Sequence, residues 1–465
     1  MNTEFLLAFS VYGLILAIIS YSFYKKSKNA QDFMLGNRSL NYVATAIATH
    51  SSDMSIWLFM GLPGSVYLFG MKQAWIPVGL VCGMFLTWHY VAQQLRTATE
   101  KYNSYTLSSY FEKRFNDTSG SLRLISAFLA LLFFVFYISS GLVAMGNMFE
   151  SVFHIDYYCG TFIGLLITLI YTLAGGFIGV AWCDLFQGLF LLIMIMLVPF
   201  FGYQLLPNGW TTITDVAHLK SISLSMIPHS FKEIISCVLL ATSWGLGYFG
   251  QPHILVNFMG SKSGSSIKKA KYIGMTWQCI TLSAAVLVGL IGIGLFTNTL
   301  TNNELIFVEM VQLLFSPFIA GFVLCAIIAA GLTTIDTQIL VSGSIFAEDI
   351  YKQFFNKKAT DKKMLFISRA GVIIISLISF VIACTRISSV YGLVDYAWTG
   401  LGSSFGPVIL TSLYCKKITK HGTIVGMIVG GLIAALWPWA GSTIPAMIPG
   451  FFSNLTIILL LSKKK

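Results

Sequence analysis

WGLGYFGQP, residues 244–252, interrupts an apolar segment that extends from 230 to 258, and THSSDMS, residues 49–55, interrupts another that extends from 41 to 69. Glycine weakens a helix through its conformational freedom, and proline does so because it lacks a backbone N–H. Interrupted helices are tolerated at membrane depth where they line a protein-walled cavity, and in transporters they commonly mark the binding site. The two stretches therefore predict a helical membrane protein with a central cavity.

The composition supports a membrane protein. Hydrophobic residues make up 56% of the 465 residues and charged residues only 10%, whereas soluble domains contain about 25% charged residues. Apolar runs recur, and each is long enough to cross about 30 Å of hydrocarbon as a helix. The first run, 5–24, is too long for a signal peptide and lacks a basic region before it. We expect it to be retained as the first membrane helix.

The apolar runs divide the chain into thirteen expected spans. Their approximate ranges are 5–24, 41–69, 72–95, 122–150, 155–175, 177–205, 230–258, 272–297, 313–345, 364–384, 388–414, 421–440 and 443–462. The two interrupted spans are the second and the seventh, five spans apart. This spacing predicts a single transmembrane domain, 1–465, that contains two five-helix repeats, 41–205 (helices 2–6) and 230–414 (helices 7–11). The repeats have inverted topology because five is odd.

The distribution of basic residues predicts the orientation in the membrane. Of the 29 Lys and Arg residues, all but four fall in one set of alternate loops; the four exceptions are Lys72, Lys220, Lys232 and Arg386. Cytoplasmic loops carry an excess of Lys and Arg. We therefore expect the N-terminus outside and the C-terminus in the cytoplasm. The net charge of +11 is explained by this orientation, so nucleic-acid binding is not expected.

Three carboxylates lie inside apolar spans: Asp53, Asp184 and Asp336. A lone charge at the bilayer centre costs about 2.5–3.5 kcal/mol on insertion scales, so each needs a partner. No Lys or Arg lies in the middle of a span, which favours a bound cation or a proton over an ion pair within the bundle.

The ninth span offers oxygen ligands beside one of these carboxylates. It contains AAGLTTIDTQ at residues 329–338, in which Thr333, Thr334, Asp336 and Thr337 lie within about one helical turn. Hydroxyls and carboxylates suit small hard cations. The break in the second span would add free backbone carbonyls near Ser51 and Met54. The pattern indicates a sodium site, although hydroxyls in membrane helices also commonly bond the preceding helical turn.

Other residues are less specific. Trp57, Tyr137, Trp244 and Tyr248 lie near breaks or polar residues, which suits a cavity wall, but each alone is more often a packing residue. His50 could relay protons, but a packed histidine is the more common case. The eight cysteines are scattered and include no CxxC pair, so neither a zinc site nor a disulfide framework is indicated.

Several longer motifs occur in a familiar order. They are LGNRSL at 35–40, SDMS at 52–55, MGLPG at 60–64, residues 244–253, YAW at 396–398 and FGP at 405–407. On these motifs the chain resembles the sodium/solute symporter family nearly end to end, and within it the bacterial proline carriers. The resemblance implies an all-α LeuT-type core with thirteen helices in the bacterial inner membrane. It also implies Na⁺ as the coupling ion and import of proline or a closely related small solute.

The resemblance also implies roles for individual residues. The main sodium site would consist of the carbonyls of Ser51, Met54 and Ala330 with the hydroxyls of Thr333 and Thr334. Asp53 and Ser55 are tied to sodium affinity in the family, and Arg38 to coupling. The proline pocket would consist of Trp57, Tyr137, Trp244, Tyr248 and Pro252. Asp184, Thr333, Asp336 and Thr337 match a second sodium site of a sialic-acid-transporting relative.

Three residues depart from the pattern of the proline carriers. Ile56 replaces a glycine beside the pocket tryptophan, His50 replaces a small residue, and Asp336 replaces a hydroxyl or small residue. The first leaves the exact solute open, because a bulky side chain can reshape the cavity. The third predicts stronger binding of a second sodium ion or a proton.

Other functions are weighed against symport. A proton-coupled carrier, or a carrier of another small amino acid or organic solute, fits the same features. A membrane solute sensor is less expected, because only three lysines follow the last span. No HExxH, GxSxG or Walker motif occurs, so an enzyme is not expected. The chain is expected to lie in the lipid bilayer, and nothing in the sequence indicates an obligate protein partner.

Overall fold

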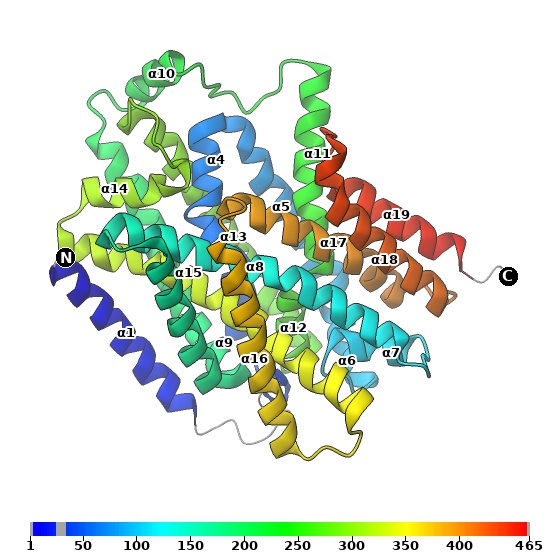
Figure 1. The fold of residues 1–465 in the computed structure, drawn as a ribbon. Coiled ribbons are helices and arrows are strands. Elements are labelled where there is room, and N and C mark those ends of the chain that lie inside the picture. Colours follow the sequence, from blue (N-terminus) through cyan, green and yellow to red (C-terminus); the bar gives the residue numbers. More distant parts are fainter. Residues whose placement is uncertain (1–2, 25–33, 463–465) are drawn as a thin grey trace.

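The computed structural model describes residues 3–24 and 34–462, and all regular structure within these ranges is helical (Figure 1). Eight helices of the described chain are long and apolar enough to cross a membrane, and four shorter apolar helices accompany them. The expected all-α membrane class is confirmed. Some of the basic residues behind the predicted orientation, Lys25, Lys26, Lys28 and the tail 463–465, lie outside the described residues.

The long helices correspond to the expected apolar spans. They are α1 (Thr3–Tyr24), α8 (Ser121–Phe153), α9 (Tyr157–Leu205), α13 (Gly264–Leu295), α15 (Pro317–Ser344), α16 (Asp361–Cys384), α17 (Val390–Tyr414), α18 (Lys420–Leu436) and α19 (Met447–Leu460). Within α9 the backbone of Gly176 has a φ of 57°, a left-handed conformation that glycine adopts readily. This break coincides with the expected boundary between the spans 155–175 and 177–205.

Three further membrane segments consist of several short helices. They are α3 (Tyr42–Met54), η2 (Ile56–Leu58) and α4 (Gly61–Phe69); η3 (Met71–Ala74), α5 (Trp75–Leu86), η4 (Thr87–Ala92) and α6 (Gln93–Lys101); and α11 (Phe231–Gly247), η5 (Tyr248–Gly250) and α12 (Pro252–Met259). The other elements are η1 (Gly36–Arg38), α7 (Leu107–Arg114), α10 (Trp210–Leu219), η6 (Asn303–Leu305), α14 (Ile306–Leu314), η7 (Ile345–Phe355) and η8 (Trp437–Ala440).

The broken helices lie inside the bundle. The first broken segment, α3, packs against α9, α12, α13 and α15, and α11 packs against α5 and α17. Figure 1 shows α1 at one edge and the pair α18–α19 at the opposite edge. A Cβ added at Gly79 would overlap the Ala241 carbonyl, and one at Gly83 would overlap that of Gly245. These glycines therefore let α5 and α11 approach closely, as small residues commonly do between membrane helices.

Candidate functional site

The first broken segment is interrupted at Ser55. Helix α3 ends at Met54, and Ser55 has a φ of 50°, a conformation that costs a residue other than glycine roughly 1–3 kcal/mol. The Ser55 Oγ accepts a hydrogen bond of 3.1 Å from the backbone N–H of Trp57. This bond caps the start of the next short helix, η2.

The second interrupted segment opens between Gly247 and Pro252. Gln251 has an extended backbone (φ −88°, ψ 102°), and Pro252 occupies the first turn of α12, where its missing N–H costs nothing. The Gln251 side-chain amide donates to the carbonyls of Gly247 at 3.2 Å and Trp398 at 3.1 Å. One glutamine thereby bonds a carbonyl that the break leaves free and ties the break to α17.

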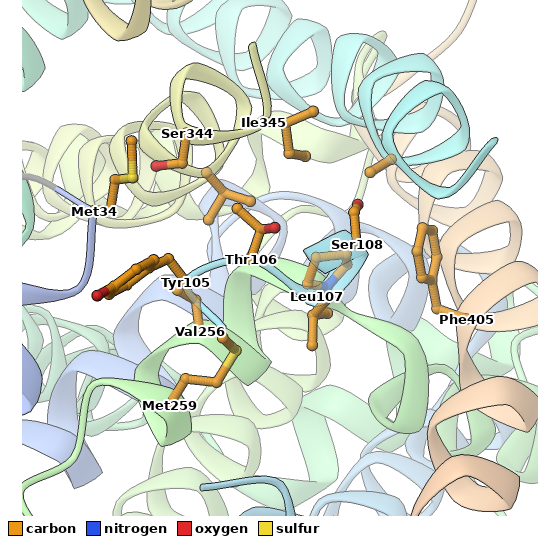
Figure 2. A pocket seen from close by; sticks show the side chains of 13 residues that line it. Met34, Tyr105, Thr106, Leu107, Ser108, Val256, Met259, Ser344, Ile345 and Phe405 are labelled. Atoms are coloured by element: carbon orange, nitrogen blue, oxygen red, sulfur yellow. The ribbon is translucent and has the colours of Figure 1, made fainter. Parts of the chain in front are cut away.

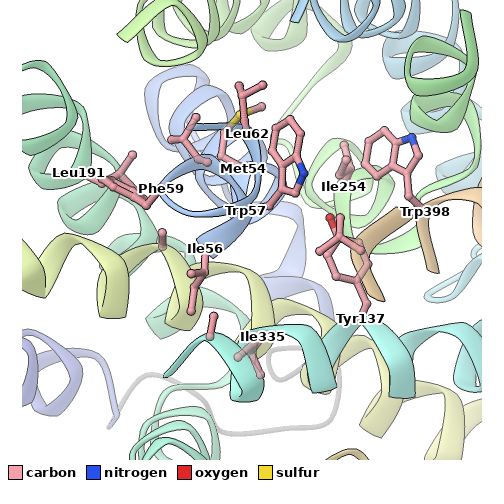
Figure 3. Packing of buried hydrophobic residues seen from close by; sticks show 14 of the residues in the cluster. Met54, Ile56, Trp57, Phe59, Leu62, Tyr137, Leu191, Ile254, Ile335 and Trp398 are labelled. Carbon is pink, nitrogen blue, oxygen red and sulfur yellow. The ribbon is translucent and has the colours of Figure 1, made fainter. Parts of the chain in front are cut away.

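The two breaks and their neighbours enclose a small cavity. The volume open to the centre of a water-sized sphere is about 10 Å³. The lining residues are Asp53, Met54, Ser55, Trp57, Leu80, Tyr137, Trp244, Tyr248, Val394 and Trp398. Figure 3 shows the Trp57, Tyr137 and Trp398 side chains facing this space. That room suits about one water molecule. The structure is therefore a closed conformation, and an amino acid enters only if side chains or helices move.

Aromatic rings form most of the cavity wall. The ring centroids of Trp57 and Trp244 are 4.9 Å apart, as are those of Tyr248 and Trp398, which meet edge to face at 88°. The Trp398 Nε1 donates to the Trp244 carbonyl at 3.0 Å. The Trp57 Nε1 is buried and has no hydrogen-bond partner among the described residues. It is thus a donor available to a ligand.

A carboxylate lies at the polar end of this cavity. The Tyr248 hydroxyl donates to the Asp53 Oδ2 at 2.6 Å and accepts from the Gln278 Nε2 at 2.9 Å. The preceding residue in α3, Ser52, accepts a hydrogen bond of 3.1 Å from the Asn257 side-chain amide. No ion pair found among the described residues involves Asp53. A neutral hydroxyl therefore joins the first break to the second.

Two residues discussed from the sequence lie elsewhere. Pro252 lines a different cavity, together with Val256 and Met259; the last two are labelled in Figure 2. Ile56 is only 1% exposed and does not line the aromatic cavity. A Cβ added at Gly331 would lie 2.7 Å from the Ile56 side chain, so the isoleucine occupies the space that this glycine leaves on α15. Its bulk therefore does not fill the aromatic cavity.

The oxygen atoms expected to bind sodium lie between α3 and α15. The Thr333 hydroxyl donates to the carbonyls of Ser51 at 2.9 Å and Ala330 at 3.1 Å. The Thr334 hydroxyl is buried without a hydrogen-bond partner in the described chain. Met54 lies about one turn beyond Ser51 and lines the aromatic cavity. Buried carbonyl and hydroxyl oxygens, one of them unpaired, fit a small hard cation.

The carboxylates of Asp184 and Asp336 form a second polar cluster between α9 and α15. Both Asp184 oxygens and the Asp336 Oδ2 are buried without a hydrogen-bond partner among the described residues. The Thr337 hydroxyl donates to the Asp336 Oδ1 at 3.4 Å and to the Thr333 carbonyl at 3.2 Å. The two carboxylates are close enough to repel each other, and no Lys or Arg pairs with either in the part of the chain that is described.

Arg38 connects the segment before α3 to two other parts of the chain. Its guanidinium donates to the Met259 carbonyl at 2.8 Å, to the Ser104 carbonyl at 2.9 Å and to the Thr99 hydroxyl at 3.1 Å. Burial, with repulsion from Arg96, lowers the pKa of Arg38 to about 10, so it stays charged at neutral pH. The start of the first broken segment, at α3, is thereby held to the end of the second broken segment, at α12.

His50 is a packed side chain. The Trp88 Nε1 donates to its Nε2 at 3.1 Å, and the two rings stack with centroids 5.9 Å apart. A Cβ added at Gly274 would overlap the imidazole edge. Among the described residues, no chain of donors and acceptors leads through His50, so the structure does not support a role for it as a proton relay.

Sequence reasoning missed several residues of the aromatic cavity. Trp398, Leu80 and Val394 line it, and Gln278 holds the Tyr248 hydroxyl. Trp398 belongs to the YAW motif at 396–398, which was a usable signal. Leu80 and Val394 look like any other apolar membrane residue, so no sequence signal would have singled them out.

Comparison with known proteins agrees with this geometry. The model of the sodium:solute symporter family matches residues 33–430. The high-affinity proline transporter PutP of Bacillus subtilis (strain 168) is 41% identical over 453 residues, which cover 96% of this chain and 95% of that protein. The sodium/proline symporter of Escherichia coli (strain K12) is 40% identical, with 98% and 93% covered.

Solved structures of transporters share the fold. A substrate-bound outward-open Na⁺-coupled sialic acid symporter superimposes with a TM-score of 0.83 at 18% identity, covering 99% of this chain and 97% of that chain. MhsT in complex with L-phenylalanine superimposes with a TM-score of 0.58 at 11% identity, covering 90% and 97%. These neighbours have the LeuT fold. With matches over nearly its whole length, this multi-pass membrane protein belongs to the sodium:solute symporter family.

Proposed function

We propose that the chain is a sodium-coupled secondary active symporter that imports proline, or a closely related small solute, by alternating access. The observation that carries the proposal is the closed aromatic cavity between two helix breaks, with buried oxygens that suit a sodium ion close by, between α3 and α15. The names of the relatives that match at about 40% identity over nearly the whole chain support proline as the solute.

The cavity wall suits proline chemically. The faces of Trp57, Trp244 and Trp398 offer apolar contact to a small saturated ring, and aromatic faces also attract an ammonium group. Asp53 supplies a nearby negative charge, and the unpaired Trp57 Nε1 supplies a donor for a carboxylate. Pro252 lines the other cavity, so we assign it to the path of the solute and not to the pocket itself.

For the coupling ion we propose a site formed by Ser51, Met54, Ala330, Thr333 and Thr334. The Thr333 hydroxyl already contacts two of these carbonyls. A sodium ion between the same oxygens would be bound by a lone pair of the hydroxyl oxygen, while the hydroxyl keeps its proton and turns it away from the ion. The ion would hold α3 to α15 beside the break at Ser55. Sodium and proline then favour the same conformation, and by linkage each raises the affinity for the other. Asp53, Ser55 and Arg38 are proposed to set sodium affinity and coupling.

A second cation site is proposed at Asp184, Asp336 and Thr337. Two mutually repelling carboxylates without a base are costly in a membrane interior, and a sodium ion or a proton would remove that cost. A proton-coupled carrier therefore remains the alternative that this cluster specifically favours. A sensor has no comparable observation behind it.

The proposed topology has thirteen spans, with the N-terminus outside and the C-terminus in the cytoplasm of a bacterium, in the inner membrane. The inverted repeats would be 41–205 and 230–414. The position of the two breaks supports them, because each break interrupts the first helix of its repeat. Transport would then proceed by movement of these repeats around the fixed site.

The test uses purified protein in proteoliposomes. Uptake of labelled proline and of a panel of other amino acids is measured with an inward sodium gradient, with an inward proton gradient, and with neither. We expect accumulation of proline that requires sodium and collapses with a sodium ionophore. Accumulation driven equally well by the proton gradient alone would contradict the choice of coupling ion, and preference for another solute would contradict the choice of proline.

A further inference from the structure

A third cavity, much larger than the aromatic one, lies between α8, α17, α18 and η8. A water-sized sphere finds about 550 Å³ of room in it, within the range of small-molecule sites. Its floor includes Thr399 and Ala434, which are almost fully buried, and its mouth includes Ile387 and Trp439, which are 62% and 79% exposed. Val394 faces the aromatic cavity whereas Asp395 faces this one, so the two cavities lie on different sides of α17.

Asp395 is the single charged side chain among the residues that line this cavity. None of the hydrogen bonds or ion pairs found among the described residues involves its carboxylate. The first turn of the same helix, α17, is capped by another carboxylate, that of Glu304 in η6. The two Glu304 oxygens accept from the backbone N–H groups of Val390 and Tyr391 at 3.0 and 2.8 Å. Asp395 lies beyond that first turn, and its oxygens are open to the cavity.

The nearest basic residue in the sequence is held elsewhere. The Arg386 guanidinium is 3.4 Å from the Glu150 carboxylate and lies 3.7 Å above the centre of the Tyr157 ring. No Lys, Arg or His is found among the described residues that line the cavity. A carboxylate in such surroundings gains from any cation that fits the space, because no fixed counter-ion offsets its charge.

The aromatic side chains around Asp395 indicate which cation fits. Phe136 and Tyr396 meet edge to face with centroids 4.9 Å apart, and Trp439 stands at the mouth. Aromatic faces bind organic ammonium groups, including quaternary ones, by cation–π attraction. The volume exceeds what a bare metal ion needs, and the lining offers a single carboxylate, whereas a sodium site needs several oxygens.

We propose that this cavity binds an organic ammonium group, which pairs with Asp395 and lies against Phe136, Tyr396 and Trp439. The ammonium can belong to a phospholipid headgroup such as ethanolamine or choline, or to a free amine of similar size. The site is separate from the proposed sodium and proline sites and does not depend on them. An exposed tryptophan at the mouth is typical of the membrane–water interface, which would allow a lipid to reach the cavity from the side.

The test is a binding titration of the purified full-length protein in detergent at constant sodium chloride. The ligands are short-chain phosphatidylethanolamine, phosphatidylcholine and phosphatidylglycerol, and the soluble cations ethanolamine and tetramethylammonium. Because a charge-assisted bond would be lost, we expect the two ammonium lipids to bind about tenfold or more tightly than phosphatidylglycerol. Asp395→Asn should remove this preference.

Two further variants keep the experiment decisive. Ala435→Phe places a ring in the cavity and should weaken every ammonium ligand while Asp395 stays in place. Asp215→Asn, at an exposed carboxylate on α10, removes the same charge elsewhere and should bind like the wild type. Each variant is compared by melting temperature so that unfolding is recognised.

The outcomes separate the two sources of the ligand. Binding of the ammonium lipids but not of the soluble cations assigns the site to a headgroup, and comparable binding of the soluble cations assigns it to a free amine. Equal binding of all three lipids, or a preference for ammonium that survives both Asp395→Asn and Ala435→Phe, would overturn the proposal.

Discussion

Replacing Tyr248 by phenylalanine tests the polar link between the two helix breaks. Tyr248 is fully buried, and its hydroxyl donates to Asp53 at 2.6 Å while accepting from Gln278 at 2.9 Å. Phenylalanine keeps the ring and its contact with Trp398. The substitution therefore removes one oxygen atom and leaves two buried polar groups without that partner.

The size of the effect follows from the type of bond. A hydrogen bond to a charged group contributes about 1.5–3 kcal/mol, and each 1.4 kcal/mol changes an equilibrium constant tenfold. The bond joins α3 to η5 in the closed conformation, so its loss should disfavour closure by roughly 10- to 150-fold. A carrier that closes less readily around proline needs more proline to do so. We expect the KM for proline to rise by that factor.

The assay is initial uptake of labelled proline into proteoliposomes over a range of proline and sodium concentrations. Tyr110→Phe is the matched control, because Tyr110 is also fully buried and donates to a neutral acceptor, Ser412, at 3.2 Å. A neutral bond contributes only about 0.5–1.5 kcal/mol, and this one lies outside the aromatic cavity. The control should lower the melting temperature slightly and leave the KM unchanged.

Two results would refute the reasoning. One is a wild-type KM for Tyr248→Phe in a protein that is well folded. The other is an increase no larger than that of Tyr110→Phe, which would show that the Asp53 contact has no special weight in closure.

Three other substitutions test the remaining parts of the site. Thr333→Val removes the hydroxyl between α3 and α15 and should raise the sodium concentration for half-maximal uptake at least about tenfold; Thr333→Ser should restore it, and equal sodium dependence in all three proteins would argue against the site. Asp336→Asn should lower the number of charges moved per proline, measured from reversal potentials. A ratio of one that the substitution leaves unchanged would contradict the proposed second cation site. Gly247→Ala places a methyl group against the Trp398 indole and should abolish most uptake and lower the melting temperature, whereas Gly13→Ala, which faces open space, should do neither; normal uptake by Gly247→Ala would show that this contact is not needed.

The apolar runs predicted the helices well because a membrane helix must be apolar along a fixed length. The breaks were also predictable: the polar run 49–55 ends at the positive φ of Ser55, and the glycines and proline of 244–252 become η5 and the extended Gln251. Both patterns act locally, within one segment of backbone, which is why the sequence alone reveals them.

Contacts between distant segments were harder to predict. From the sequence, the bulk of Ile56 was expected to be able to reshape the cavity, but Ile56 packs against Gly331, 275 positions later in α15. Pro252 was grouped with the pocket aromatics, yet it lines another cavity. Leu80 and Val394 line the aromatic cavity without any polar or aromatic signal of their own. Each of these outcomes depends on which helix faces which, and a single sequence does not encode that visibly.

The sequence by itself determined the membrane class, the interrupted helices and the three carboxylates that need compensation, since bilayer thickness, helix propensity and the cost of burying charge act on each segment separately. Only the tertiary structure decided that Asp53 is bonded by Tyr248, whereas Asp184 lies within electrostatic reach of Asp336 and no Lys or Arg of the described chain pairs with either. It alone also placed Asp395 in a large aromatic cavity. The physical reason is that compensation of a buried charge comes from whichever atoms packing brings within about 3 Å, and those atoms lie on helices far away in the chain.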